Sequence, residues 1–139
     1  MKRLNVFLLA NMLLCPLLAT AQLAVTVMPP NLVGGKTVVF LAMTNNLAES
    51  VESARAICFL LDDQGKMVGR STKWVIGGTI DRPPLQPKAG TTFNFVITST
   101  RPFATTNFVA KISFSRLVLA GGKLADPSKD VAVAQPAQK

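Results

Sequence analysis

From residue 22 onward, short apolar runs follow one another, and within them every second residue is hydrophobic. The runs TTFNFVIT (91–98) and FVAKISFS (108–115) show this alternation most clearly. A two-residue period turns successive side chains to opposite faces, so each run predicts a β-strand with one buried face. Arg116 breaks the alternation of the second run, which predicts a β-bulge, with Leu117 and Leu119 continuing on the other face. No stretch of ten residues outside these runs has the period of an amphipathic helix, so we expect an all-β chain.

Turn residues separate the runs. The segment Asp62–Gly65 (DDQG) predicts a tight hairpin with Gly65 in the positive-φ region. Residues 79–90 contain three prolines and a glycine and are expected to form a loop. In the run 66–76, the section from Trp74 either continues the strand or follows a bulge. The expected strands are 23–28, 37–44, 54–62, 66–76, 91–98, 108–115 and 130–133.

Seven strands joined by short connections predict a single antiparallel β-sandwich of the immunoglobulin type, and an open barrel is the competing architecture. The chain has 139 residues, 49% of them hydrophobic, which suffices for one domain with its own core. We expect this domain to occupy residues 22–125. Residues 126–139 are expected to form a C-terminal tail with at most one short strand, and its end at 135–139 is expected to be mobile.

The first 21 residues have the three parts of a secretory signal peptide. Lys2 and Arg3 precede an apolar stretch at 6–18, and the small-residue sequence ATA at 19–21 ends the segment. The apolar stretch is shorter than the roughly 20 residues of a membrane-spanning helix. We therefore expect cleavage after residue 21, with Gln22 as the new N-terminus, and retention as an uncleaved anchor is the alternative.

Without residues 1–21 the chain has 13 basic and 7 acidic residues, a net charge of +6, and one cysteine, Cys58. A lone cysteine forms no internal disulfide, and no Asn-x-Ser/Thr glycosylation sequence is present. An exported chain of this kind fits the bacterial periplasm or extracellular space better than eukaryotic secretion. Histidine is absent from the whole sequence, which excludes Ser-His-Asp and Cys-His catalysis and histidine-ligated metals. We expect neither an enzyme nor a cofactor.

Five motifs follow one another between residues 38 and 97. They are a TNN turn, a CFLLD segment, the DDQG hairpin, an LQPKAG segment and an FNF strand. In this order they resemble the extracytoplasmic immunoglobulin-like modules named FxLYD. Cys58 stands where the family name has Phe, Leu61 stands where it has Tyr, and two extra residues separate Pro87 from Gly90. The resemblance covers about half of the mature chain, and it implies an envelope accessory or binding role without catalytic residues.

Residues with reactive or metal-binding side chains are few. Cys58 lies among apolar neighbours, so we expect a buried and inert thiol, with an intermolecular disulfide or a reactive thiol as the alternative. The carboxylates of Asp62–Gly65 could suggest a calcium loop, but the basic and apolar KMVGR that follows favours a simple hairpin turn. Glu49 and Glu52 are expected to be solvated loop acids rather than a glycosidase pair.

Basic residues are scattered along the chain rather than grouped in runs. Arg70 and Lys73 flank a polar section next to Trp74, and Arg55 would lie nearby across the expected hairpin. These four residues are the candidate binding patch. For Trp74 itself we favour packing between the two sheets, where immunoglobulin-like domains often place a central tryptophan.

The positive charge attracts anionic surfaces such as phospholipid headgroups, lipopolysaccharide or acidic polymers, and export argues against nucleic acid as the ligand. We therefore expect a non-catalytic module that binds an envelope protein or an anionic polymer through a sheet edge or a loop face, with no stable membrane span after signal cleavage. The alternative is a carrier of small apolar ligands, in which phenylalanines would line a barrel-like cavity: Phe93, Phe95, Phe108 and Phe114.

Overall fold

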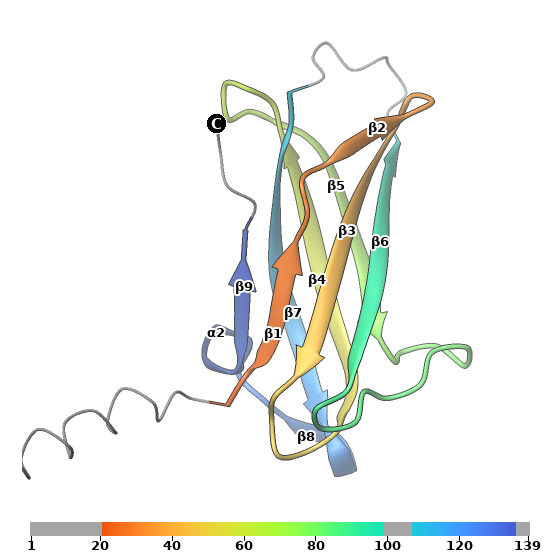
Figure 1. Cartoon of the computed structure of the whole chain (residues 1–139), viewed down its shortest axis with the longest axis vertical. Helices are drawn as coiled ribbons and strands as arrows, with labels where there is room; N and C mark the ends of the chain where they lie inside the picture. The colour runs from red at the N-terminus through yellow and green to blue at the C-terminus, as the bar shows by residue number, and fades with distance from the viewer. Residues whose placement is uncertain (1–20, 99–106, 136–139) are drawn as a thin grey trace, which may run out of the picture.

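The computed structural model describes residues 21–98 and 107–135, which form two β-sheets packed face to face (Figure 1). Residues 1–20 of the expected signal peptide and residues 136–139 of the expected tail lie outside the described residues. Sheet A contains β1 (Leu23–Val27), β2 (Asn31–Val33), β3 (Lys36–Asn45), β6 (Gly90–Thr98) and β9 (Val131–Ala134). Sheet B contains β4 (Val51–Leu61), β5 (Met67–Ile76), β7 (Val109–Leu119) and β8 (Lys123–Leu124).

All seven expected strands are present, and β5 is a single strand across 67–76. The sequence pattern missed β2 and β8, which have three and two residues and are too short to show a period. The sheets are antiparallel except where β9 runs parallel to β1. This pairing makes β9 part of the sandwich, so the domain extends to residue 134 and past the expected boundary at 125. The short helix α2 (Pro127–Asp130) leads directly into β9.

The core lies between the inner faces of the two sheets. In β3 every second residue is buried, as the two-residue period of the sequence predicts. Leu41, Leu60 and Phe95 come from β3, β4 and β6, and each is 0% exposed. Burial of each such side chain stabilises the fold by about 1.5–3 kcal/mol. Within the described residues no strand pairing joins sheet A to sheet B, so the chain is a sandwich and the barrel alternative is wrong.

A β-bulge at Ser115 turns the side chains at the end of β7 into the core. Phe114 and Arg116, on either side of Ser115, pair with consecutive residues of β4, so Ser115 is the extra residue. The expected bulge is thus confirmed. The extra residue also reverses the alternation, and Leu117 and Leu119 return to the inner face, where both are buried. The expectation that they lie on the other face is wrong for this reason.

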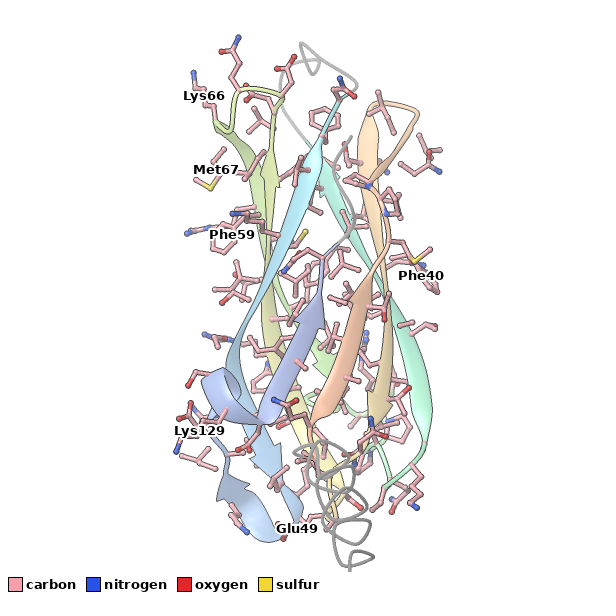
Figure 2. The ribbon with its side chains drawn as sticks, turned by 60° about the vertical axis from the view of Figure 1, so that its left-hand side comes forward. Phe40, Glu49, Phe59, Lys66, Met67 and Lys129 are labelled. Atoms are coloured by element: carbon pink, nitrogen blue, oxygen red, sulfur yellow. The ribbon has the colours of Figure 1, made fainter. Side chains whose placement is uncertain are left out.

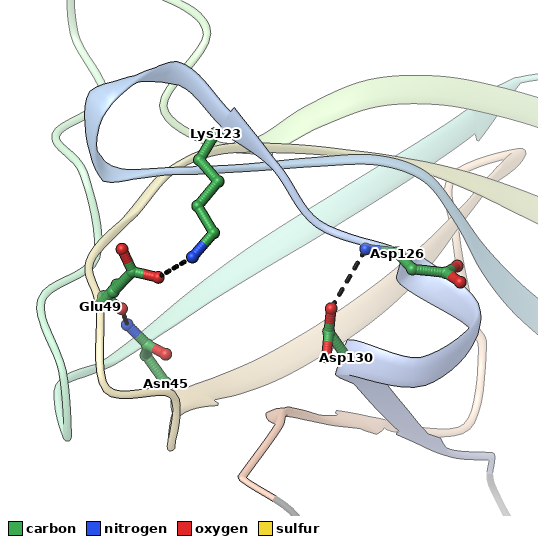
Figure 3. A network of polar contacts seen from close by, with 5 residues as sticks. All are labelled: Asn45, Glu49, Lys123, Asp126 and Asp130. Atoms are coloured by element: carbon green, nitrogen blue, oxygen red, sulfur yellow. Dashed lines mark hydrogen bonds and ion pairs between the residues drawn. The ribbon is translucent and has the colours of Figure 1, made fainter.

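Asn45, at the end of β3, joins two connections at one end of the sandwich (Figure 3). Its side chain is 0% exposed, and its Nδ2 donates hydrogen bonds to the carbonyls of Glu49 (2.9 Å) and Leu85 (3.0 Å). Its Oδ1 accepts from the backbone N–H of Leu47 at 2.9 Å. One buried amide thus forms hydrogen bonds with backbone groups of both segments. Asn45 therefore holds the β3–β4 connection against the loop that contains Leu85.

The C-terminal part of the chain is tied to the same end. Lys123 Nζ lies 2.9 Å from Glu49 Oε1, and Figure 3 shows this ion pair beside the Asn45 contact. Asp126 caps α2 by accepting hydrogen bonds from the backbone N–H and the hydroxyl of Ser128. These bonds stabilise the carboxylate and lower the pKa of Asp126.

Candidate binding surface

The outer face of sheet B is centred on β4, whose side chains alternate between core and solvent. Ala56, Cys58 and Leu60 point inward and are each 0% exposed. The residues between them therefore point outward. Arg55 is exposed, and Ile57 and Phe59 are half-buried. Because β4 is flanked by β5 and β7, each outward residue of β4 is the middle of a three-residue row.

One row combines an aromatic ring with two guanidinium groups. Arg55 pairs with Trp74 of β5 on one side and with Arg116 of β7 on the other. The guanidinium carbon of Arg55 lies 5.9 Å from the centre of the Trp74 ring, which is within the range of a cation–π interaction. Arg55 Nε also donates to Ser115 Oγ at 3.3 Å, so the bulge residue helps to orient this guanidinium.

A second row lies four residues further along β4. Phe59 pairs with Arg70 of β5 and with Lys111 of β7, so an aromatic side chain stands between two cations. Figure 2 shows Phe59 projecting from this side of the sandwich, while Phe40 of β3 projects from the opposite side. Ile57 forms the row between these two, with Thr72 and Ser113 as neighbours. We call the exposed residues Arg55, Arg70, Lys111 and Arg116, together with Trp74 and Phe59, the basic face.

The structure assembles three of the four residues expected in the patch. Arg55, Arg70 and Trp74 lie on the basic face, and Lys73 does not. Lys73 pairs with the inward-pointing Ala56, so it lies on the inner side of the edge strand β5, where it is exposed at the rim. Successive residues of a strand point to opposite faces, and neighbours in sequence such as Lys73 and Trp74 therefore cannot share one face.

Sequence reasoning missed Lys111 and Arg116 as members of the site. Lys111 occupies an outward position of the alternating run, which is the signal that could have included it. For Arg116 the strand pairing is needed as well, because the bulge at Ser115 decides which residue lies beside Arg55.

Trp74 does not pack between the sheets, and that expectation is wrong. A second irregularity of pairing separates Trp74, opposite Arg55, from Ile76, opposite Ala54. The extra residue, Val75, and Ile76 are both buried, while Trp74 lies half-buried on the outer face. Gly78 covers part of the ring, since a Cβ on this glycine would lie 2.4 Å from Trp74 Cγ, and its φ of +77° suits glycine.

Acidic residues are absent from the three rows. Of the seven acids, Glu52 lies near the start of β4, Asp130 lies in α2, and the other five lie in turns and connections. Glu52 Oε2 accepts a hydrogen bond from the backbone N–H of Gly121 at 3.0 Å. In the described part of the chain, the Lys123–Glu49 contact is the one ion pair, so the four cations of the basic face are not neutralised by any described carboxylate.

Cys58 and Asp62, the other candidate residues, serve the core and a turn of the fold. Cys58 is 0% exposed and unpaired, and burial raises the pKa of its thiol to about 12, as expected for an inert core cysteine. Asp62 Oδ1 accepts from the backbone N–H groups of Gln64 and Lys66, both at 2.9 Å, which confirms the hairpin turn. Among residues 21–98 and 107–135, no three His, Cys, Asp or Glu residues gather where a metal could bind.

The four phenylalanines of the carrier hypothesis belong to the core or pack against it. Phe95 is 0% exposed and Phe114 is 9% exposed, and the rings of Phe93 and Phe95 meet edge to face at 5.1 Å. Phe93 and Phe108 are half-buried against the same cluster. A pocket of about 230 Å³ lies elsewhere, between the end of β5, the 82–90 loop and the start of β6. Pockets for small-molecule ligands are usually about 300–1,000 Å³.

Comparison with known proteins shows similarity of fold, without similarity of sequence. The chain resembles the structure of IrmA from Escherichia coli, with a TM-score of 0.51 and 11% sequence identity over 86% of this chain and 98% of that one. At this identity the similarity concerns the β-sandwich fold alone. No protein-family model and no curated protein sequence matches the chain. In the described residues, no helix has the length and apolar character needed to cross a membrane.

Proposed function

We propose that this protein is an exported, non-catalytic interaction module that binds an anionic polymer or surface of the cell envelope through the basic face. The observation that carries the proposal is the presence of four cations on three adjacent strands, with no described acidic side chain in the same rows. A charged surface of this kind raises the local concentration of anions and steers their approach.

The arrangement of the cations suits an extended partner. Neighbouring strands are about 4.8 Å apart, and the four-residue separation between Arg55 and Phe59 spans roughly 13 Å of strand. Arg70 and Lys111 lie on opposite sides of Phe59, so the charges are spread over a sheet face instead of converging on one point. A spread of this kind can contact several anionic groups of a polymer or lipid surface at the same time, whereas a small anion would reach only one or two.

The Arg55–Trp74 contact favours binding in a second way. Arg55 is held by the ring of Trp74 and by the Ser115 hydroxyl, so less side-chain entropy is lost when an anion binds to it. Arginine also presents a planar fork of N–H donors that fits carboxylate and phosphate groups. Trp74 thus acts as a positioning residue for the cation beside it.

The N-terminal sequence supports an envelope location. Its signal-peptide pattern, the unpaired Cys58 and the resemblance to FxLYD modules favour an exported protein of the bacterial periplasm or surface. In that compartment the available polyanions are lipopolysaccharide, acidic polysaccharides and anionic phospholipid headgroups. Nucleic acid is not proposed as a partner for an exported protein.

Trp74 provides a direct test because it is the sole tryptophan and the chain has no tyrosine. Titration of the mature domain with dextran sulfate should change Trp74 fluorescence and saturate, and added salt should reverse the change. Neutral dextran is the matched control and should have no effect. An unchanged spectrum at dextran sulfate concentrations that produce binding by another method would place the ligand elsewhere and overturn the proposal.

A further inference from the structure

Strand β6 has one free edge. Its nine residues pair with β3 along their whole length, from Gly90 opposite Thr44 to Thr98 opposite Lys36. Within residues 21–98 and 107–135, no backbone hydrogen bond forms from the other edge of β6. β5, which belongs to the facing sheet, contacts β6 but does not pair with it. Figure 1 shows β6 as the outermost strand on its side of sheet A. Unpaired N–H and C=O groups of this kind can accept a further strand.

The edge of β6 lacks the features that usually prevent strand addition. Its sequence, GTTFNFVIT, contains no lysine, no proline and no bulge. The neighbouring edge strand β5 has such features, with Arg70, Lys73 and the irregular pairing around Val75. At the other side of sheet A the edge is the four-residue β9. In sheet B, β7 also has an open edge beyond its two-residue pairing with β8, but β7 carries Lys111, Arg116 and the bulge at Ser115. Among the described edges, β6 is therefore the long open one that lacks such features.

Two cations line the rim between β5 and β6. At the upper end the strands are in contact, since a Cβ on Gly69 would lie 2.6 Å from Ile97. Lys73 is on this same inner side of β5, four residues further along, and is exposed. Arg82 lies over the ring of Phe93 on β6, with its guanidinium carbon 4.7 Å from the ring centre. Neither cation has a carboxylate partner among the described residues, although Asp81 is next to Arg82 in the loop.

A pocket lies next to this rim, with Arg82 as part of its wall. It has a volume of about 230 Å³ and is lined by Val75, Ile76, Arg82, Pro84, Leu85 and Thr91 among others. A cavity of this size, apolar on most sides and next to the start of β6, could hold one side chain of a strand added to the edge. Pockets for alternate side chains are what give strand addition its specificity.

We propose that the free edge of β6 accepts an extended acidic segment of another protein as an added strand, with Lys73 and Arg82 pairing with its carboxylates. The positive charge of the rim favours an acidic segment over a second copy of this chain. A second copy of the chain would bring its own Lys73 and Arg82 to the same rim and add repulsion between two positively charged domains. An acidic segment meets unpaired cations instead, and its backbone supplies the hydrogen bonds that β6 lacks. This surface shares no residue with the basic face, so the inference does not depend on the proposed function.

The test uses the mature domain and a nine-residue peptide in which Glu alternates with Val. The peptide should slow amide exchange in β6, and a peptide in which Gln replaces Glu should bind roughly tenfold more weakly. The double variant Lys73→Gln/Arg82→Gln should lose a similar factor. The double variant Arg55→Gln/Arg116→Gln has the same change of charge on the basic face and should keep the affinity.

Backbone methylation of the peptide tests the strand geometry without changing the protein. In a paired strand, alternate N–H groups face the partner. N-methylation of one set, either all Val or all Glu residues, should abolish binding, and N-methylation of the other set should leave it nearly unchanged. Three results would each overturn the inference. The first is an equal effect of methylating either set, and the second is no binding at millimolar peptide. The third is binding that requires Arg55 and Arg116 while exchange of the β6 amides stays unchanged.

Discussion

The guanidinium carbon of Arg55 lies 5.9 Å from the ring centre of Trp74, across the β4–β5 pairing and on the outside of the sandwich. This contact places the sole tryptophan next to a cation on the surface, where a central core position was expected. Gly78, two residues beyond the end of β5, lies against the ring of Trp74. The local structure of the basic face therefore depends on a glycine outside it.

Gly78→Ala should destabilise the protein and change the environment of Trp74. The new Cβ would meet the ring at 2.4 Å, and the φ of +77° is unfavourable for alanine. Gly122→Ala is the matched control, since Gly122 has a φ of +78° and nothing within 4 Å of its Cβ position. We expect Gly122→Ala to cost about 1 kcal/mol and Gly78→Ala clearly more. Equal losses in thermal unfolding, with unchanged Trp74 fluorescence, would contradict the contact.

Asn45→Ala should cost about 2 kcal/mol or more in the free energy of unfolding. The substitution leaves buried partners of the amide without hydrogen bonds, and a buried unsatisfied group costs about 1–3 kcal/mol. Thr37 gives the opposite case on the same strand, because its buried Oγ1 has no hydrogen-bond partner in the described part of the chain. Thr37→Val should be neutral or stabilising by up to about 1 kcal/mol. Urea unfolding measures both, and a larger loss for Thr37→Val than for Asn45→Ala would refute this assignment.

Phe95→Ala should cost roughly 3–5 kcal/mol, because a fully buried ring is removed from the core. Phe40→Ala provides the comparison, since Phe40 is 38% exposed on the outer face of sheet A. Its loss should be less than about 1.5 kcal/mol. Similar shifts of the melting temperature for both variants would mean that Phe95 does not fill the core, which is what a carrier with a cavity at this position would show.

Cys58 should react with a thiol reagent such as Ellman's reagent only when the chain unfolds. Its pKa is raised from 9.0 to about 12 in the folded state, so the folded protein keeps the proton where the unfolded chain loses it. This contribution to stability is complete below pH 9.0 and is lost as the pH rises toward 12. The free energy of unfolding of the wild type should therefore fall more steeply over this range than that of Cys58→Ala. Rapid labelling of the native protein at pH 8 would contradict the burial.

The two-residue period was enough to predict the seven longer strands, the inner face of β6 and the inner face of β7 up to the bulge at Ser115. Phe95, Ile97 and Ile112 are buried where the alternation puts them. The period could not predict which strands lie side by side, because pairing depends on contacts between residues far apart in the sequence. The parallel pairing of β9 with β1 is one such case, and it moved the domain boundary.

The candidate surface was predictable only in part for the same reason. Arg55 and Trp74 were correctly expected to be neighbours, since a tight hairpin brings their strands together. Lys73 was misplaced by its proximity in sequence, although strand alternation puts it on the opposite side from Trp74. Arg116 reaches the row of Arg55 through the bulge at Ser115, whose effect on pairing becomes visible in the structure.

The most direct test of the basic face compares two double variants that remove equal charge. Arg55→Gln/Arg116→Gln takes two cations from this face, and Lys36→Gln/Lys129→Gln takes two exposed cations from β3 and α2. Affinity of each mature domain for dextran sulfate would be measured by calorimetry at several salt concentrations. We expect the first variant to bind at least about tenfold more weakly and with a smaller salt dependence, and the second to stay within about twofold of the wild type. Equal losses in both would show that net charge alone governs binding and would contradict a site on the basic face.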